Sequence, residues 1–103
     1  MQLIILYSLQ AGVEREDFVS WVRDIDYPTM RGLQRVDSFK TYETKKLLIG
    51  EGAPSVSYVE VFDIPDLDGF MAEDLGGAKV QAIMAQFMGF AAKPEFIICE
   101  EII

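Results

Sequence analysis

The spacing of hydrophobic and polar positions changes several times along the chain, and each spacing predicts an element. Residues 2–9, QLIILYSL, form a short run of β-favouring residues that stops at Ala11-Gly12, which predicts a strand. Between residues 14 and 25 the hydrophobic side chains follow the i, i+3, i+4, i+7 spacing of a helix with one buried face. These side chains are Phe18, Trp21, Val22 and Ile25. Tyr27-Pro28 should end or bend this helix, because the residue before proline is disfavoured in helical geometry.

The second part of the chain predicts three further strands and two further helices. A loop containing Gly and Pro at residues 47–56 should separate two strands, and Asp66 is a good helix cap. Gly76-Gly77 should interrupt the helical run, and Lys93-Pro94 should end it. The expected elements are strands at residues 36–44, 57–64 and 96–102, and helices at residues 66–75 and 78–92.

This order of elements predicts one α+β domain over residues 1–103, a ferredoxin-like βαββαβ sandwich with a four-stranded antiparallel sheet. Helices should cover one face of the sheet. The other face is also apolar, because Ile4 and Leu6 alternate with Leu3 and Ile5, and Ile97 alternates in the same way with its neighbours. We therefore expect a homodimer that forms a dimeric α+β barrel, with a monomer of imperfect pattern as the alternative.

Charge and composition exclude several classes of function. Seventeen acidic residues against nine basic ones give a formal net charge of −8, and the longest basic run is Lys45-Lys46. Nucleic acids and anionic membranes are therefore not expected partners. The hydrophobic runs are too short for a membrane span or a signal peptide, and we expect a cytoplasmic protein.

The residue types that are missing restrict the chemistry further. The chain has no histidine and a single cysteine, Cys99, so it lacks the usual general base, the usual zinc ligand sets and an internal disulfide. We expect no metal and no cofactor. Cys99 lies among apolar residues and is predicted to be a buried small hydrophobe rather than a reactive thiol. Any proton transfer must rely on Asp, Glu, Tyr, Lys, Arg or the substrate.

Charged side chains crowd the junction between the first helix and the second strand, WVRDIDYPTMRGLQRVDSF. If the junction turns inward, Asp24 or Asp26 could accept an N–H hydrogen bond or act as general base, and Arg23 or Arg31 could hold a ligand oxygen. The competing interpretation is that these charges pair with one another on the surface.

Aromatic side chains could line a flat apolar pocket for a planar ligand, although most aromatic residues in a small domain belong to its core. Glu60 lies between Val59 and Val61 in a predicted strand, where it faces either a pocket or the dimer seam. The predicted ligand-binding residues are Tyr7, Trp21, Arg23, Tyr27, Phe39, Tyr58 and Glu60.

Two motifs resemble those of the RedY/HapK-like proteins of the dimeric α+β barrel superfamily. They are D-x-P-T-x-R-G-L at residues 26–33 and G-E-G-A-P at residues 50–54, within a resemblance that extends from Leu6 to Glu101. The resemblance implies a homodimer with a pocket between the sheet and the helices of each subunit. It also implies a pyrrolic or indolic ligand from prodigiosin-type pigment or bisindole biosynthesis. Many members of the superfamily use a pocket histidine, which this chain lacks.

Three functions follow from these observations. The first is a cofactor-free protein that binds a pyrrole, bipyrrole or similar planar aromatic intermediate and assists its condensation. The second is a cofactor-independent enzyme, such as a cyclase, dehydratase or monooxygenase, with Asp26 or Asp24 as base and Arg31 stabilising negative charge. The third is a non-catalytic dimeric partner protein, which would need no cavity.

Overall fold

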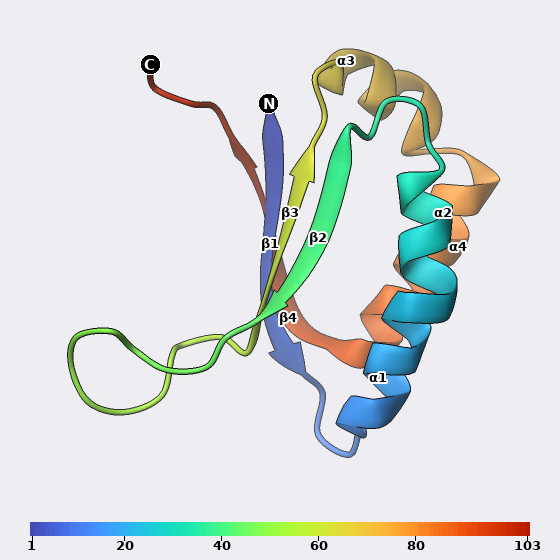
Figure 1. Ribbon diagram of the computed structural model, residues 1–103. Helices are drawn as coiled ribbons and strands as arrows, with labels where there is room; N and C mark the ends of the chain where they lie inside the picture. The colour runs from blue at the N-terminus through green and yellow to red at the C-terminus, as the bar shows by residue number, and fades with distance from the viewer.

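The computed structural model describes residues 1–103 as a four-stranded antiparallel sheet with helices on one face (Figure 1). The strand order is β2-β3-β1-β4, as in ferredoxin-like folds, so the predicted α+β class is confirmed. In chain order the elements are β1 (Gln2–Leu9), α1 (Arg15–Trp21), the π-helical η1 (Val22–Asp26), α2 (Tyr27–Arg31), β2 (Ser38–Glu43), β3 (Tyr58–Asp63), α3 (Leu67–Gly69), the π-helical η2 (Phe70–Asp74), α4 (Ala78–Phe90) and β4 (Ala91–Cys99).

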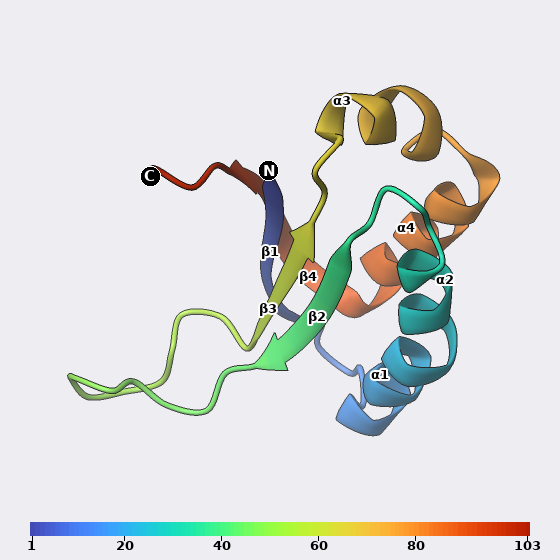
Figure 2. The same cartoon turned by 45° about the horizontal axis from the view of Figure 1, so that its top comes forward.

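The register of the sheet determines which side chains face the helices. β1 is central and pairs with β3 and β4, so Ile5 lies opposite Glu60 on one side and Phe96 on the other. Alternation places these three side chains on the face that α1, α2 and α4 cover (Figure 2). The core forms in this layer and includes a parallel stack of Phe39 and Phe62, whose ring centroids are 3.9 Å apart.

The first helical segment continues past the proline that was expected to end it. Helical backbone runs from Arg15 to Arg31. The wider turn of η1 places Pro28 in the first turn of α2, where proline is tolerated because its missing backbone N–H does not remove a helical hydrogen bond. The π-helical turn inserts one extra residue and rotates the buried face by one position. Ile25, predicted to be buried, is therefore exposed, and Asp26 is buried instead.

The last strand begins earlier and ends earlier than predicted. α4 ends at Phe90, and β4 starts directly at Ala91. Lys93 has a positive φ of 47°, and the register with β1 shifts between Leu6 and Ser8. This irregularity accommodates Pro94 in a strand that lies at the sheet edge, where a missing backbone donor is tolerated. Cys99, the last residue of the strand, is partly buried.

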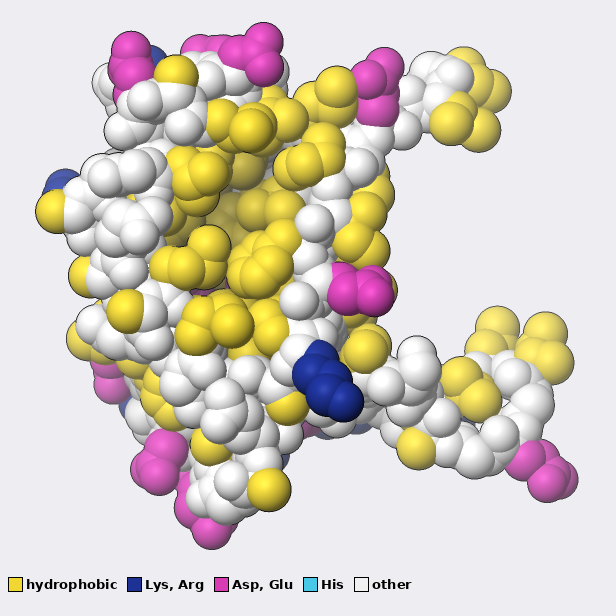
Figure 3. All heavy atoms as spheres, turned by 180° about the vertical axis from the view of Figure 1, so that it is seen from behind, with side chains coloured by type: hydrophobic (Ala, Val, Ile, Leu, Met, Phe, Trp, Pro, Cys, Tyr) yellow, Lys and Arg dark blue, Asp and Glu magenta, His cyan; other side chains and the backbone are white.

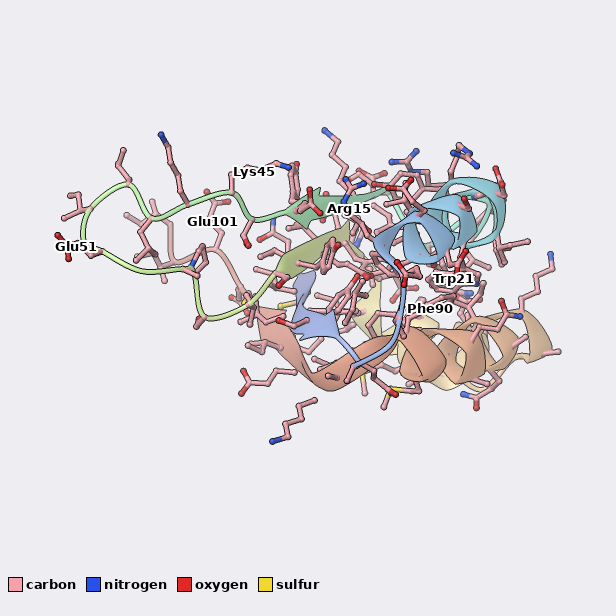
Figure 4. The ribbon with its side chains drawn as sticks, turned by 90° about the horizontal axis from the view of Figure 1, so that it is seen from below. Arg15, Trp21, Lys45, Glu51, Phe90 and Glu101 are labelled. Carbon is pink, nitrogen blue, oxygen red and sulfur yellow. The ribbon has the colours of Figure 1, made fainter.

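Two segments extend beyond the sheet on the side away from the helices. They are the loop between β2 and β3 and the chain end after Cys99, and Figure 4 shows Glu51 and Glu101 on this side. Leu48 in the loop is 94% exposed, and Ile102 in the chain end is 95% exposed. None of the helices has both the length and the apolar character needed to cross a lipid bilayer.

Candidate functional site

A cavity of about 260 Å³ lies between the sheet and the helical layer. Sixteen residues line it, and fourteen of them are hydrophobic. Its mouth opens beside β4, where lining residues Met71, Phe96 and Ile98 are exposed, and Figure 3 shows a hollow within a hydrophobic surface. The hydrophobic lining residues are Leu3, Ile5, Met30, Phe62, Leu67, Phe70, Met71, Leu75, Val80, Ile83, Met84, Phe87, Phe96 and Ile98.

The two remaining lining residues are both carboxylic acids, Asp26 and Glu60. Each is only 2% exposed. Glu60 accepts a hydrogen bond from the hydroxyl of Tyr7 through Oε2, whereas Oδ2 of Asp26 is buried without any hydrogen-bond partner. A buried carboxylate oxygen without a donor is costly, so the site favours a ligand that supplies one.

Burial makes both carboxyl groups unusually basic. It raises the pKa of Asp26 to about 7, and Arg31 offsets only part of this effect. Burial also raises the pKa of Glu60 to about 8; the Tyr7 hydrogen bond lowers it and the charge of Asp26 raises it. The pKa of the Tyr7 hydroxyl is raised as well, mainly by burial and then by Glu60. The pair therefore retains a proton near neutral pH, which suits both a proton donor and a proton acceptor.

Local backbone geometry brings the two acids together from distant parts of the chain. Glu60 points into the helical layer because it alternates with Val59 and Val61 along β3. Asp26 points toward the sheet because the π-helical turn of η1 shifts the buried face of that helix by one residue. The sequence pattern favoured each residue as a candidate, but it did not indicate that they share one cavity.

The predicted aromatic residues surround the site rather than line it. Tyr7 stacks on Tyr58 with ring centroids 5.6 Å apart. The indole N–H of Trp21 donates a hydrogen bond to Oε1 of Gln86, with an N–O distance of 2.6 Å. Figure 4 shows Trp21 and Phe90 side by side between α1 and α4. The Tyr27 hydroxyl accepts from the backbone N–H of Thr41, and the Tyr27 ring contacts Phe39 edge to face. The aromatic rings that line the cavity are those of Phe62, Phe70, Phe87 and Phe96.

The other predicted charges lie outside the cavity. Arg23 and Asp24 form an exposed ion pair with an N–O distance of 2.9 Å, as the competing interpretation expected. Arg31 donates from Nε to the carbonyl oxygen of Phe39 and places its guanidinium 3.5 Å from the centroid of the Tyr27 ring. No Lys or Arg side chain lines the cavity, so the acids have no cation beside them there.

A short helical segment that sequence reasoning did not connect with the site forms one wall. α3 and η2 contribute Leu67, Phe70 and Met71 to the lining. Arg35 holds this segment through ion pairs to Glu73, Asp74 and Asp66, with N–O distances of 2.7, 3.2 and 3.4 Å. The LDGF turn at residues 67–70 was the available signal, because its Leu and Phe are spaced to face the same side.

Comparisons with known proteins agree with this architecture. HapK from Hahella chejuensis superposes with a TM-score of 0.72 at 24% identity, covering 97% of this chain and 93% of that one. An ethyl tert-butyl ether D (EthD) family protein from Bacillus halodurans C-125 superposes with a TM-score of 0.71 at 19% identity, covering 98% of this chain and 97% of that one. A dimeric ferredoxin-like protein of unknown function from Thermobifida fusca YX superposes with a TM-score of 0.71 at 18% identity, covering 93% of this chain and 85% of that one.

The similarity to these structures supports the fold. No curated protein sequence matches the chain. A family model described as "REDY-like protein HapK" matches residues 1–102. The match covers the π-helical junction, the carboxyl pair and all four strands. The chain therefore belongs to the HapK family of REDY-like proteins.

Proposed function

We propose that this protein binds a pyrrole, bipyrrole or similar planar aromatic intermediate of prodigiosin-type pigment biosynthesis and assists its condensation. The observation that carries the proposal is the buried pair of Asp26 and Glu60, the only polar side chains in an otherwise hydrophobic cavity. Membership of the HapK family supports the ligand class.

The composition of the cavity suits a flat heteroaromatic molecule with an N–H group. Four phenylalanine rings among the lining residues offer faces and edges for a conjugated ring system. Oδ2 of Asp26 lacks a donor, and a pyrrole N–H would supply one. A ligand without any donor would leave this oxygen buried and unpaired.

The same pair can assist a condensation between a pyrrole carbon and a carbonyl group. Protonated Glu60 donates its proton to the carbonyl oxygen while the new C–C bond forms, and ionised Asp26 accepts the ring proton released when the pyrrole regains aromaticity. Asp26, protonated by that step, supplies a second proton to the resulting hydroxyl group, which leaves as water. Ionised Glu60 then takes the N–H proton of the cation that forms, which gives the neutral product and restores both acids to their starting protonation states. Both acids hold and release protons near neutral pH, because burial raises their pKa values to about 7 and about 8.

The proposal includes a homodimer in which two sheets face each other. The outer face of the sheet carries no helix, and it presents Ile4, Leu6, Val61 and exposed Ile97. The Thermobifida fusca neighbour is described as dimeric, which supports this arrangement. Replacing Ile97 by Lys should shift sedimentation toward an 11.6 kDa monomer. Ile25→Lys is the matched control, because Ile25 is similarly exposed, 43% against 37%, but lies on the helical layer.

Titration with 2,2′-bipyrrole-5-carbaldehyde, followed by its visible absorbance, tests the binding proposal. We expect saturable binding to the native protein, weaker binding to Asp26→Asn, and little binding of the corresponding bifuran aldehyde, which has the same shape without the N–H groups. Asp24→Asn is the matched control, since Asp24 is an exposed junction residue. Equal binding of the bipyrrole and bifuran aldehydes would refute recognition through the buried acids.

A rate measurement separates a binder from an enzyme. We expect the protein to accelerate condensation of the bipyrrole aldehyde with a monopyrrole. The Glu60→Gln variant should lose this acceleration but keep its affinity for the aldehyde. Saturable binding without any acceleration by the native protein would leave a carrier function and remove the catalytic part of the proposal.

A further inference from the structure

The cavity combines two buried acids with a complete lack of positive side chains. All of its other lining residues are hydrophobic, and the single hydrogen bond to Glu60 comes from the neutral hydroxyl of Tyr7. Arg31 is the charged residue that influences Asp26 most, but it is exposed and engaged with Tyr27 and the Phe39 carbonyl group. An anionic group on a ligand would therefore find no cation in the cavity.

From this arrangement we infer that the cavity selects against carboxylated ligands and accepts the uncharged aldehyde, ester or unsubstituted form of the same heteroaromatic compound. This inference rests on the proposed function, because it names the chemical form of the ligand that the same site takes. A ligand carboxylate would lie near Asp26 and Glu60 in surroundings of low polarity, where repulsion between like charges is poorly screened.

The protonation of the pair does not remove this discrimination. One proton on Glu60 can satisfy a carbonyl oxygen of the ligand, which is neutral. The same proton can form a hydrogen bond with a ligand carboxylate, but it does not neutralise the negative charge of that group. No lysine, arginine or other cation lines the cavity to do so. Specificity of this kind arises from an unfavourable interaction with the wrong ligand rather than from an extra contact with the right one.

The inference assigns the protein a place in a reaction sequence. Heteroaromatic acids must first lose their free carboxylate, by reduction to the aldehyde, esterification or decarboxylation, before they enter this site. The protein then acts on the product of that step and not on its precursor.

Competition binding with three bipyrroles tests this inference. They are 2,2′-bipyrrole-5-carboxylate, its methyl ester and the 5-carbaldehyde, measured at pH 7.5 against the native protein. We expect the ester and the aldehyde to bind with similar affinity and the carboxylate to bind at least about tenfold more weakly, which corresponds to about 1.4 kcal/mol. The ester controls for size, because it is larger than the carboxylate but uncharged.

Two results separate this inference from the proposed function. Carboxylate binding within threefold of the ester would overturn the inference while leaving pyrrole binding intact. Failure of all three compounds to bind would instead refute the proposed function and the inference together. In Asp26→Asn, checked for native circular dichroism, the difference in log Kd between ester and carboxylate should narrow to less than about half of its native value, because this change removes the ionised acid of the pair. An unchanged gap there would count against repulsion by this pair.

Discussion

Tyr7 and Glu60 are joined by a hydrogen bond across the two central strands of the sheet. Tyr7 lies opposite Tyr58 in the register, so Glu60 is its diagonal neighbour on the same face. The phenol donates to a buried carboxyl group that lines the cavity, and it makes edge-to-face contact with Phe87 on α4, with ring centroids 4.8 Å apart. Tyr7 therefore connects the acid pair to the helical layer and fixes the orientation of one acid.

Replacing Tyr7 by Phe should raise the pKa of Glu60 above about 8, because the Tyr7 hydrogen bond lowers it in the native protein. Loss of the donor should also destabilise the protein by about 1–3 kcal/mol at pH values where Glu60 is ionised. Carboxyl ¹³C chemical shifts measured over a pH series would follow the pKa. Tyr58→Phe is the matched control, since the Tyr58 hydroxyl donates to Glu43 instead. A Glu60 pKa that moves equally in both variants would contradict this role of Tyr7.

The buried acids predict that the native protein becomes less stable as the pH rises from 5 to 8.5. The pKa values of Asp26 and Glu60 increase from 3.8 and 4.5 to about 7 and about 8 on folding, so the folded chain binds more protons than the unfolded chain across this window. The free energy of unfolding therefore falls with increasing pH until both groups are ionised. We expect the thermal midpoint to drop by at least about 5 °C.

The double variant Asp26→Asn, Glu60→Gln separates this effect from general repulsion in a chain of net charge −8. Its thermal midpoint should change much less between pH 5 and pH 8.5 than that of the native protein. Glu43 does not interfere, because Arg15 and Lys45 lower its pKa to about 2 and it stays ionised throughout the window. An equal slope in both proteins would show that the buried pair does not carry the pH dependence.

Replacing Arg35 by Ala should loosen the cavity wall formed by α3 and η2. Arg35 makes ion pairs with Asp66, Glu73 and Asp74, and this partly exposed network is worth about 1 kcal/mol or less per pair. We expect faster ligand dissociation in stopped-flow experiments and faster amide exchange at residues 67–75, with little loss of global stability. Arg23→Ala breaks an exposed pair away from the cavity and should change neither quantity.

Filling part of the cavity should weaken ligand binding without unfolding the domain. Met84 on α4 lines the cavity, whereas Met88 lies one turn later on the same helix, outside it and exposed. Tryptophan at position 84 should occupy part of the space of about 260 Å³ and weaken binding of the bipyrrole aldehyde by at least about tenfold. Tryptophan at position 88 should leave affinity unchanged. Normal binding by the Met84 variant would place the ligand elsewhere.

Periodicity was sufficient to predict the strand and helix order, because each apolar stripe has a clear period. The alternation along the third strand was also sufficient to identify Glu60 as an unusual position, whereas Asp26 was favoured by the crowding of charges at the junction and by the motif at residues 26–33. Periodicity failed at residues 22–28, where a π-helical turn changes which residue faces inward; a pattern that assumes 3.6 residues per turn places Ile25 in the core. The start of β4 was missed because Lys93-Pro94 was interpreted as the end of a helix. The strand instead runs through Pro94, since β4 lies at the sheet edge and its backbone is irregular at Lys93.

The resemblance to RedY/HapK-like proteins implied a pocket between the sheet and the helices, but the residues that line the cavity could not be predicted from periodicity. Its lining comes from β1, β3, β4, η1, α2, the segment of α3 and η2, and α4, and their meeting depends on tertiary packing rather than on local preference. The same limit applies to Arg31. Its position within a charged motif favoured a role in the site, but its guanidinium lies over the Tyr27 ring and not in the cavity.

The most direct test of the account follows the two buried carboxyl groups while ligand is added. In protein labelled with ¹³C at Asp and Glu carboxyl groups, the signals of Asp26 and Glu60 are identified by their loss in Asp26→Asn and Glu60→Gln. The account predicts that saturating bipyrrole aldehyde at pH 7.5 shifts these two signals and leaves exposed carboxyls such as Asp24 unmoved. Saturable binding with both buried signals unchanged would contradict it.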